Sequence, residues 1–290
     1  NASVHFCNEP FSTSTDCLVM YGRSKTELET IYNYLKSNIG ILENGFKGAG
    51  LKHISKDYIL AIEIDLPKEE IQLDFLQKNR IIDGLIEAKQ AQLHLSEELV
   101  KSRFIEMFES GNYPVCRLGD VCSKITDGTH KTPNYLDAGV TFISAKNIVN
   151  GELDFSDVKY ISDQEYAEIQ KRCQTEMGDI LLSKSGSLGA PVIVKTTERI
   201  GLFESLAVIK YDRSKLLPAF LCEQLKSDRI QRQFKVGTKG VAIKHLHLGV
   251  IADTDIVVTR FEYQNAFATF VEQTDKSKYH CESTHEIEVA

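Results

Sequence analysis

The chain has 290 residues, 42% of them hydrophobic, and a formal net charge of −7. That length accommodates two compact units and a sizeable core. Membrane and secretory proteins are disfavoured, because no apolar run approaches the ~18 residues of a membrane span and no charged-then-apolar leader opens the chain.

The first 67 residues read as the later part of a module of mixed strands and helices. A β-like run over 16–21 precedes a helix expected near Glu27–Ser37, and a glycine-rich loop over 44–50 leads to alternating apolar residues over 59–64. Without its first half, such a piece would expose sheet edges. We therefore expect it to be less stable or to pair with another chain.

Residues 68–110 form the segment around which the rest is organised. From Glu69 to Phe108 there is no proline and one interior glycine, Gly84, which predicts one helix of roughly 60 Å at about 1.5 Å per residue. Ile86, Leu93, Val100 and Met107 follow a heptad spacing, whereas the other faces carry Glu, Lys, Gln and Arg. An ordinary bundle helix is one interpretation. A two-stranded spacer is favoured, because the flanking segments repeat.

Residues 111–260 read as a complete module that begins where Gly111 and Pro114 stop the long helix. Strands are expected near Val115–Val121, Val140–Ala145, Val158–Ile161, Ile180–Ser183, Val192–Lys195 and Leu206–Tyr211. Helices are expected at Asp163–Arg172, capped by Ser162 or Asp163, and at Pro218–Lys226 or slightly beyond. Residues 261–290 then hold the start of a second long helix, near Glu262 to Lys278, and a tail.

An internal repeat with a period of about 190 residues links the two ends of the chain. Met20-Tyr21-Gly22-Arg23-Ser24-Lys25 returns as residues 210–215, and Leu35-Lys36-Ser37 returns as residues 225–227. After a shift of two positions, residues 47–53 match 239–245, and Pro67 to Phe75 matches Thr259 to Phe267 with Gln72 and Gln264 in step. One unit of the repeat is therefore a module followed by the start of a long helix.

These features resemble the specificity (S) subunit of type I restriction–modification enzymes. The resemblance rests on Leu66–Glu70 entering the long helix, Leu99–Phe108 leaving it, Leu118–Val121 and Ile125–His130 opening the next module, and Gly178–Ser183 within it. It implies two target-recognition domains that alternate with two long antiparallel helices. Since about 65 residues precede the first helix and the second helix is short, we expect a partial, recombined or truncated subunit.

The expected fold class is α+β, with target-recognition domains of short strands and helices joined by a long coiled-coil-type spacer helix. The expected organisation is the C-terminal part of a first target-recognition domain (1–67), the spacer (68–110), a second target-recognition domain (111–260), and the start of a second spacer with a tail (261–290). Long polar loops on such a scaffold are the surface that binds a partner.

The distribution of charge allows a DNA partner in spite of the acidic total. Residues 113–260 hold 20 Lys and Arg against 18 Asp and Glu. Within 224–245 there are six basic residues and one acidic residue. The negative charge is concentrated in the helices and the chain ends, so the second module can approach a polyanion.

Four loops of the second module are the candidate DNA-binding residues. Asn bonds adenine bidentately, Lys reaches guanine or phosphate, and turn amides approach phosphates. The alternative for each is a solvated turn, with Asp127-Gly128 and Lys239-Gly240 serving backbone geometry alone. The candidates are Thr126, Asp127, Gly128, Thr129, His130, Lys131, Lys146, Asn147, Lys184, Ser185, Lys239, Gly240, Lys244 and His245.

Catalytic signatures are missing from the sequence. Residues 183–187 lack the Gly-Lys-Ser/Thr end of a P-loop. None of the six prolines is adjacent to another, which excludes the Asn/Asp-Pro-Pro-Tyr/Phe motif of amino-methyltransferases. His245-x-His247 has no third ligand nearby, and Asp179 with Lys184 does not make a nuclease centre. The seven scattered cysteines favour reduced thiols in a cytoplasm, so we predict no catalytic residue and no metal site.

The resemblance implies a non-catalytic subunit that directs methyltransferase and restriction subunits to a bipartite site on double-stranded DNA. S-adenosylmethionine, ATP and Mg are implied for those partner subunits and no cofactor for this chain. Dimerisation through the spacer helices is one way to read two half-sites. The alternative is a truncated interaction protein that binds the modification subunit, or dimerises, without reading DNA.

Overall fold

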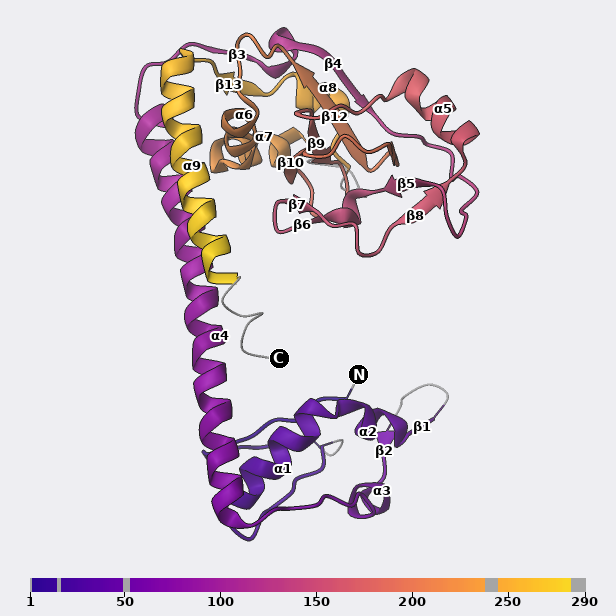
Figure 1. Cartoon of the computed structure of the whole chain (residues 1–290), viewed down its shortest axis with the longest axis vertical. Helices are drawn as coiled ribbons and strands as arrows, with labels where there is room; N and C mark the ends of the chain where they lie inside the picture. The colour runs from indigo at the N-terminus through magenta and orange to yellow at the C-terminus, as the bar shows by residue number, and fades with distance from the viewer. Residues whose placement is uncertain (1, 15–16, 49–52, 238–244, 283–290) are drawn as a thin grey trace. The chain divides into compact units, whose positions relative to one another are not determined.

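The computed structural model describes residues 2–14, 17–48, 53–237 and 245–282, with side chains in the last helix described as far as Asp275 (Figure 1). The chain divides into two compact units, Asn1–Gln92 and Leu93–Ala290. The boundary falls inside the long helix α4, which runs from Glu69 to Phe104 and ends in a π-turn over Ile105–Glu109. The expected spacer helix is therefore present, with its regular part four residues shorter than the apolar pattern to Phe108.

The first unit consists of short helices and one two-stranded ribbon beside the start of α4. In chain order its elements are α1 (Lys25–Ser37), α2 (Ile39–Asn44), β1 (Phe46–Lys47), β2 (His53–Ile54) and α3 (Lys56–Leu60). Ser24 and Ser55 cap α1 and α3 by accepting the backbone N–H of Glu27 and Tyr58. The alternating apolar residues over 59–64 do not form a strand, because Ser55 caps α3 there and the residues that follow α3 pair with no described strand.

The second unit holds the α+β module. Its strands are β3 (Val115–Arg117), β4 (Cys122–Asp127), β5 (Val140–Ile143), β6 (Ile148–Val149), β7 (Glu152–Leu153), β8 (Lys159–Ile161), β9 (Ile180–Ser183), β10 (Pro191–Ile193), β11 (Ile200–Leu202), β12 (Leu206–Tyr211) and β13 (Asp255–Val257). Its helices after α4 are α5 (Asp163–Arg172), α6 (Pro218–Lys226), α7 (Asp228–Gly237), α8 (Leu248–Ala252) and α9 (Phe261–Glu282), with 3₁₀ turns at Leu118–Val121 and Ala145–Asn147.

A four-stranded antiparallel sheet in the order β10–β9–β12–β4 forms the centre of the module. β12 lies between β9 and β4, and its alternate side chains enter different cores. Ala207, Ile209 and Tyr211 join the core formed with α6, α7 and α9, whereas Leu206 and Val208 join the core around the second sheet, β11–β5–β8. A strand buried on both faces reads as a continuous apolar run, as β9 and β12 do in the sequence.

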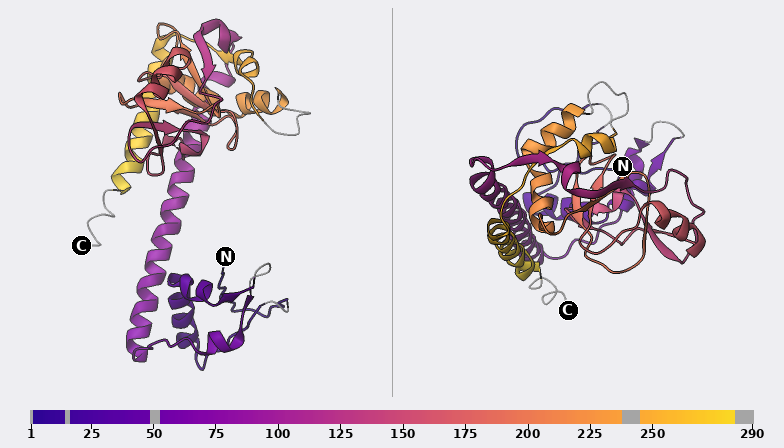
Figure 2. Two further views of the ribbon diagram at one scale, coloured as in Figure 1. Left: turned by 90° about the vertical axis from the view of Figure 1, so that its right-hand side faces the viewer. Right: turned by 90° about the horizontal axis from the view of Figure 1, so that it is seen from above.

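Aromatic side chains join the end of α4 to α9 within the second unit. Phe104 and Phe108 lie 5.5 and 5.6 Å from Phe267, measured between ring centroids, and Phe220 of α6 completes the cluster 4.8 Å from Phe108. The two helices run side by side in both sets of views (Figures 1 and 2). The apolar pattern at the end of the long helix thus packs against the start of the second one.

The two copies of the repeat have the same order of helices. α3 and α8 both have five residues, α8 starts 192 positions after α3, and α9 starts 192 positions after α4. α1 and α6 likewise end in the matched Leu-Lys-Ser segments. No helix in the described part of the chain is long and apolar enough to cross a membrane.

Candidate nucleic-acid interface

Three of the four candidate loops meet at the turn between β11 and β12. The backbone N–H of Glu204 donates to the carbonyl of Thr129 at 3.0 Å, and that of Lys184 donates to the carbonyl of Ser205 at 2.7 Å. The backbone N–H of Ala145 donates to Ser205 Oγ at 3.0 Å. This turn therefore fixes the loops 126–131, 144–147 and 183–189 to one another.

The fourth candidate loop reaches the same place through its last residues. The N–H of Leu246 donates to the carbonyl of Lys184 at 2.9 Å, which holds half-buried His245 near the other loops. Burial lowers the pKa of His245, and the nearby charge of Lys184 lowers it further. Neutral imidazole is thus the favoured form of this side chain. The candidates Lys239, Gly240 and Lys244 lie outside the described residues.

A buried carboxylate lies beneath these loops. The Asp127 side chain, 3% exposed, accepts from Lys184 Nζ and from the guanidinium of Arg172, and the Lys184 side chain is also 3% exposed. His130 Nε2 is 3.4 Å from the same carboxylate, while its Nδ1 is 2.7 Å from Glu204 Oε2. Asp127 and Lys184 form an internal ion pair, so these two candidates shape the surface without lying on it.

The pKa of Asp127 reflects two opposing effects. Burial by itself raises it, but the hydrogen bond and charge of Lys184, together with Arg172 and His130, outweigh burial and leave the pKa below its usual range. The carboxylate therefore stays ionised at neutral pH. A buried cation and a buried anion in contact satisfy each other, and either one alone would be unpaired.

Asn147, a candidate for bidentate pairing with adenine, is buried, so it is not available on the surface as that role requires. Its Oδ1 accepts the N–H of Ser144 at 3.0 Å, and its Nδ2 donates to the carbonyls of Asp154 and Asp157 at 3.1 and 3.0 Å. These bonds occupy the amide edge that would pair with adenine. Lys146 is exposed and bonds the Asp157 carboxylate at 2.9 Å.

Glycine is required at Gly128 because the chain approaches itself closely there. A Cβ on Gly128 would lie 2.1 Å from the carbonyl oxygen of Leu202. The next residue, Thr129, donates its N–H to that carbonyl at 2.9 Å. The turn after β9 is similarly constrained: Gly186 and Gly189 have φ of +71° and +80°, and Ser183 Oγ accepts the N–H of Ala190 at 2.9 Å.

A cavity of about 400 Å³ opens beside the Asp127 cluster. One wall is the loop after β4 and the other is α5. Its polar residues carry both signs of charge, and burial raises the pKa of the Cys173 thiol at its base to about 12. The lining residues are Gly128, Thr129, His130, Lys131, Pro133, Gln164, Glu165, Glu168, Ile169, Arg172 and Cys173.

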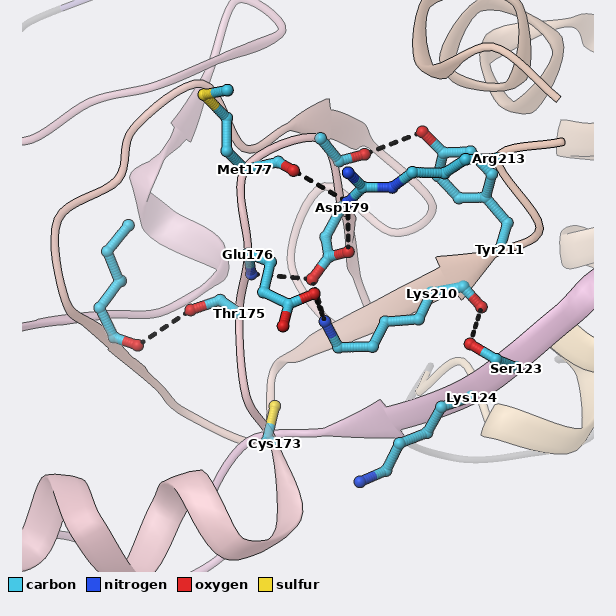
Figure 3. A network of polar contacts seen from close by, with 12 residues as sticks. Ser123, Lys124, Cys173, Thr175, Glu176, Met177, Asp179, Lys210, Tyr211 and Arg213 are labelled. Atoms are coloured by element: carbon cyan, nitrogen blue, oxygen red, sulfur yellow. Dashed lines mark hydrogen bonds and ion pairs between the residues drawn. The ribbon is translucent and has the colours of Figure 1, made fainter.

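A second buried carboxylate, Asp179, fixes the turn that leads into β9 (Figure 3). It accepts from Lys210 Nζ at 2.6 Å and from the Arg213 guanidinium at 3.2 Å, and it caps the N–H of Glu176 at 2.9 Å. The Tyr211 hydroxyl donates to the carbonyl of Gly178 at 2.9 Å. Gly178 and Asp179 therefore have a structural role, because their contacts attach this turn to β12 and to Arg213 after it.

The exposed part of the site is smaller than the set expected from the sequence. Thr126 joins Asp127 on strand β4, where the sequence analysis placed a loop, and both are buried. Lys131, Lys146 and His130 are exposed, whereas Thr129 and Ser185 are half-buried. Sequence reasoning missed Arg172, Glu204 and Ser205, because their roles come from contacts with residues far along the chain.

Among the residues that the structure describes, no group of three or more His, Cys, Asp and Glu side chains is placed to hold a metal ion. His245 and His247 lie with ring centroids 5.8 Å apart, without a third ligand in that described set. The geometry of the site is that of a rigid polar surface with a few exposed cations.

Comparison with known proteins identifies the relatives of the chain. No family model matches it. The specificity subunit of the Escherichia coli type I restriction enzyme EcoBI is 28% identical over 306 residues, which cover 94% of this chain and 64% of that protein. The chain is thus similar in sequence to a type I specificity subunit.

Solved structures show a similar fold. The chain superimposes on the S subunit of a type I restriction–modification system from M. genitalium with a TM-score of 0.53 at 15% identity, covering 89% of this chain and 68% of that one. A chain from a structure of the type I system, described for complex assembly and conformational transition, gives a TM-score of 0.53 at 16% identity, covering 89% and 67%. The chain spans 64% of the length of the curated EcoBI relative.

Proposed function

We propose that this chain recognises a sequence in double-stranded DNA for a type I restriction–modification complex. The observation that carries the proposal is the match to the EcoBI specificity subunit, which runs through 94% of the chain and so includes both copies of the repeat. The grouping of three polar loops around one turn, with Leu246 bonded to one of them, adds physical support. Base readout needs side chains held in place by a rigid scaffold, and buried ion pairs hold these loops.

We assign the contacts with DNA to the exposed members of the loops. Lys131 and Lys146 supply exposed cations, His130 and Thr129 supply hydrogen-bonding groups, and half-buried Ser185 lies on the constrained turn after β9. Lys239, Gly240 and Lys244 complete the proposed set. Asp127, Lys184 and Asn147 act from beneath by fixing loop positions.

The chain is proposed to be non-catalytic and cytoplasmic. Modification subunits carrying S-adenosylmethionine would perform methylation, which requires extrusion of the target base. A restriction subunit would use ATP and Mg. The apolar positions Ile82, Leu85 and Ile86 of α4 are 51, 56 and 43% exposed, and we propose that such positions bind a second long helix or a modification subunit.

The test is selection of targets from random duplexes by the purified chain, followed by affinity measurements over a salt series. We expect one sequence to be enriched, with log affinity falling linearly with log salt. Lys131→Ala with Lys146→Ala should weaken binding to that target by about 1–3 kcal/mol for each lysine that contacts a base, or reduce the salt slope by about 1 for each that contacts phosphate.

The matched control is Lys25→Ala with Lys78→Ala, which removes two exposed lysines of the first unit. It makes the same change in net charge and should leave the selected target bound. Binding to the modification subunit with no duplex binding, or with binding that ignores sequence, would contradict the proposal. The first of these results would select the interaction protein instead.

A further inference from the structure

Residues Cys17–Tyr21 match the central strand of the second module in sequence but not in environment. Tyr21 aligns with Tyr211 in the repeat, so Cys17–Tyr21 aligns with Ala207–Tyr211 of β12. The run Cys-Leu-Val-Met-Tyr is continuously apolar, as expected for a strand buried on both faces. In the first unit this run belongs to no helix or strand, and no described strand pairs with it.

The burial of the two copies differs at each aligned apolar position. Val208 and Ile209 are 0% exposed, whereas their counterparts Leu18 and Val19 are 48 and 40% exposed. Tyr211 is 5% exposed, and Tyr21 is 89% exposed. Large apolar side chains left in water along one strand mark a surface that another element covers.

A buried oxygen in the first unit gives independent support. Gln72 Nε2 donates to the carbonyl of Pro67 at 2.7 Å, as aligned Gln264 does to Thr259 at 2.7 Å. Gln264 Oε1 also accepts the N–H of Leu217 at 2.8 Å. Gln72 Oε1 is buried and has no hydrogen-bond partner among the described residues.

The residue that corresponds to the Leu217 donor lies in the segment that follows Cys17–Tyr21. Leu217 aligns with Glu27, whose N–H is instead held by the Ser24 cap at 3.1 Å, because α1 begins earlier than α6. The segment after Tyr21 therefore differs from its counterpart in the complete module. Gln72 Oε1 thus lacks the donor that Leu217 supplies to Gln264 in the second unit.

We propose that Cys17–Tyr21 is a docking strand that takes the central position between two antiparallel strands of the β4 and β9 type. The occupant is defined by what β12 contacts. Its β9-like strand is buried on both faces and follows a Gly-Asp turn, whose carbonyl accepts a hydrogen bond from the Tyr21 hydroxyl and whose carboxylate pairs with Arg23. Gly178 and Asp179 do this for Tyr211 and Arg213. The inference rests on the repeat and holds whether or not the chain reads DNA.

The test is an insertion variant of the full chain, with a second copy of residues 111–206 placed between Asp16 and Cys17. The readout is the alkylation rate of the Cys17 thiol, measured by peptide mass spectrometry against that of Cys7 in the same molecule. Both thiols are exposed in the present chain, so their rates should be similar. In the insertion variant Cys17 takes the place of fully buried Ala207, and its rate should fall by at least about tenfold relative to Cys7.

Two substitutions in the insertion variant separate docking from non-specific protection. Val19→Lys places a charge at the position of Ile209, which is 0% exposed, and should abolish protection. Met20→Lys restores the residue found in β12, Lys210, and should keep protection. Equal alkylation of Cys17 and Cys7, equal effects of the two substitutions, or protection of Cys17 already in the present chain would overturn the proposal.

If the insertion variant misfolds, the buried Cys222 thiol will become reactive to alkylation. A peptide experiment tests the proposal in that case. A synthetic hairpin of residues 174–195, containing β9 and β10, is added in excess to the present chain. Hydrogen exchange at the amides of Leu18–Tyr21 should slow, and Val19→Lys should prevent this. Unchanged exchange, together with a misfolded insertion variant, would also overturn the proposal.

Discussion

At the residue scale, the stability of the second module depends on charged side chains whose sequence pattern is typical of surface loops. Asp127 and Lys184 each have a side chain 3% exposed, and each compensates the other in a site that excludes water. Removing one member of such a pair leaves an unpaired buried charge, which costs more than the pair itself contributes. The polar character of these residues thus stabilises the fold beneath the proposed DNA surface.

Asp127→Asn should lower the free energy of unfolding of the second unit by about 3 kcal/mol or more. The substitution keeps the shape of the side chain but leaves Lys184 without its anion. Urea unfolding followed by a probe in the second unit measures the change. Asp137→Asn, at an exposed position, is the control and should change stability little. Equal effects of the two substitutions would contradict a structural role for Asp127.

Because the pKa of Asp127 is depressed, its contribution to the free energy of unfolding depends on pH. Unfolded Asp titrates near about 3.9, and the folded pKa lies lower. The stabilisation is therefore complete above the unfolded value and is lost as pH falls through the folded pKa. We expect the stability difference between wild type and Asp127→Asn to be constant from pH 5 to 7 and to narrow below about pH 4. A difference that persists unchanged at pH 2 would exclude this linkage.

At the scale of elements, the repeat places the same residue in two environments. Phe267 of α9 is 0% exposed and packs on Phe104 and Phe108, whereas aligned Phe75 of α4 is 43% exposed. Both lie at the same step of a long helix. The difference arises from what each helix contacts, since the local sequences agree.

Phe267→Ala should therefore cost about 3–5 kcal/mol of stability in the second unit. Phe75→Ala should cost about 1 kcal/mol or less in the first unit, because much of its ring is already in water. Chemical denaturation of the two variants gives the comparison. A large loss for Phe75→Ala would show that this ring is covered in solution.

Local sequence predicted some elements with correct ends. β9, β12, α5 and α6 have the expected bounds, because capping by Ser162, proline at the first turn of α6 and continuous apolar runs are local signals. The last two residues of β4, Thr126 and Asp127, were read as part of a loop, since they are polar and precede a glycine. Their pairing with β12 decides that they belong to a strand.

At the scale of the whole molecule, the two compact units differ in how much apolar surface they bury. Among the described residues of the first 92 positions, the buried hydrophobic side chains are Leu35, Leu42 and Leu76. The second unit buries two extended clusters on the two faces of its central sheet. A core this small in the first unit supports little independent stability.

We expect unfolding in urea to occur in two steps, with the first unit lost at the lower concentration. Native-state hydrogen exchange should show early exchange in α1 and late exchange in β9 and β12. Glu29 and Arg80, paired at 2.5 Å within the first unit, offer a matched test. Their replacement should shift only the first step. A single cooperative transition for the whole chain would contradict this description.

The sequence alone determined the repeat, the long helix, the resemblance to specificity subunits and the positions of several strands and helices. These depend on period, caps and turn residues, which are properties of neighbouring positions. Only the tertiary structure decided that Asp127, Lys184 and Asn147 are internal, that three loops meet at Glu204 and Ser205, and that Cys17–Tyr21 is exposed. Burial and strand pairing depend on residues distant in sequence, so a local pattern cannot specify whether a polar group faces water or an ion partner, or whether an apolar run finds its neighbours.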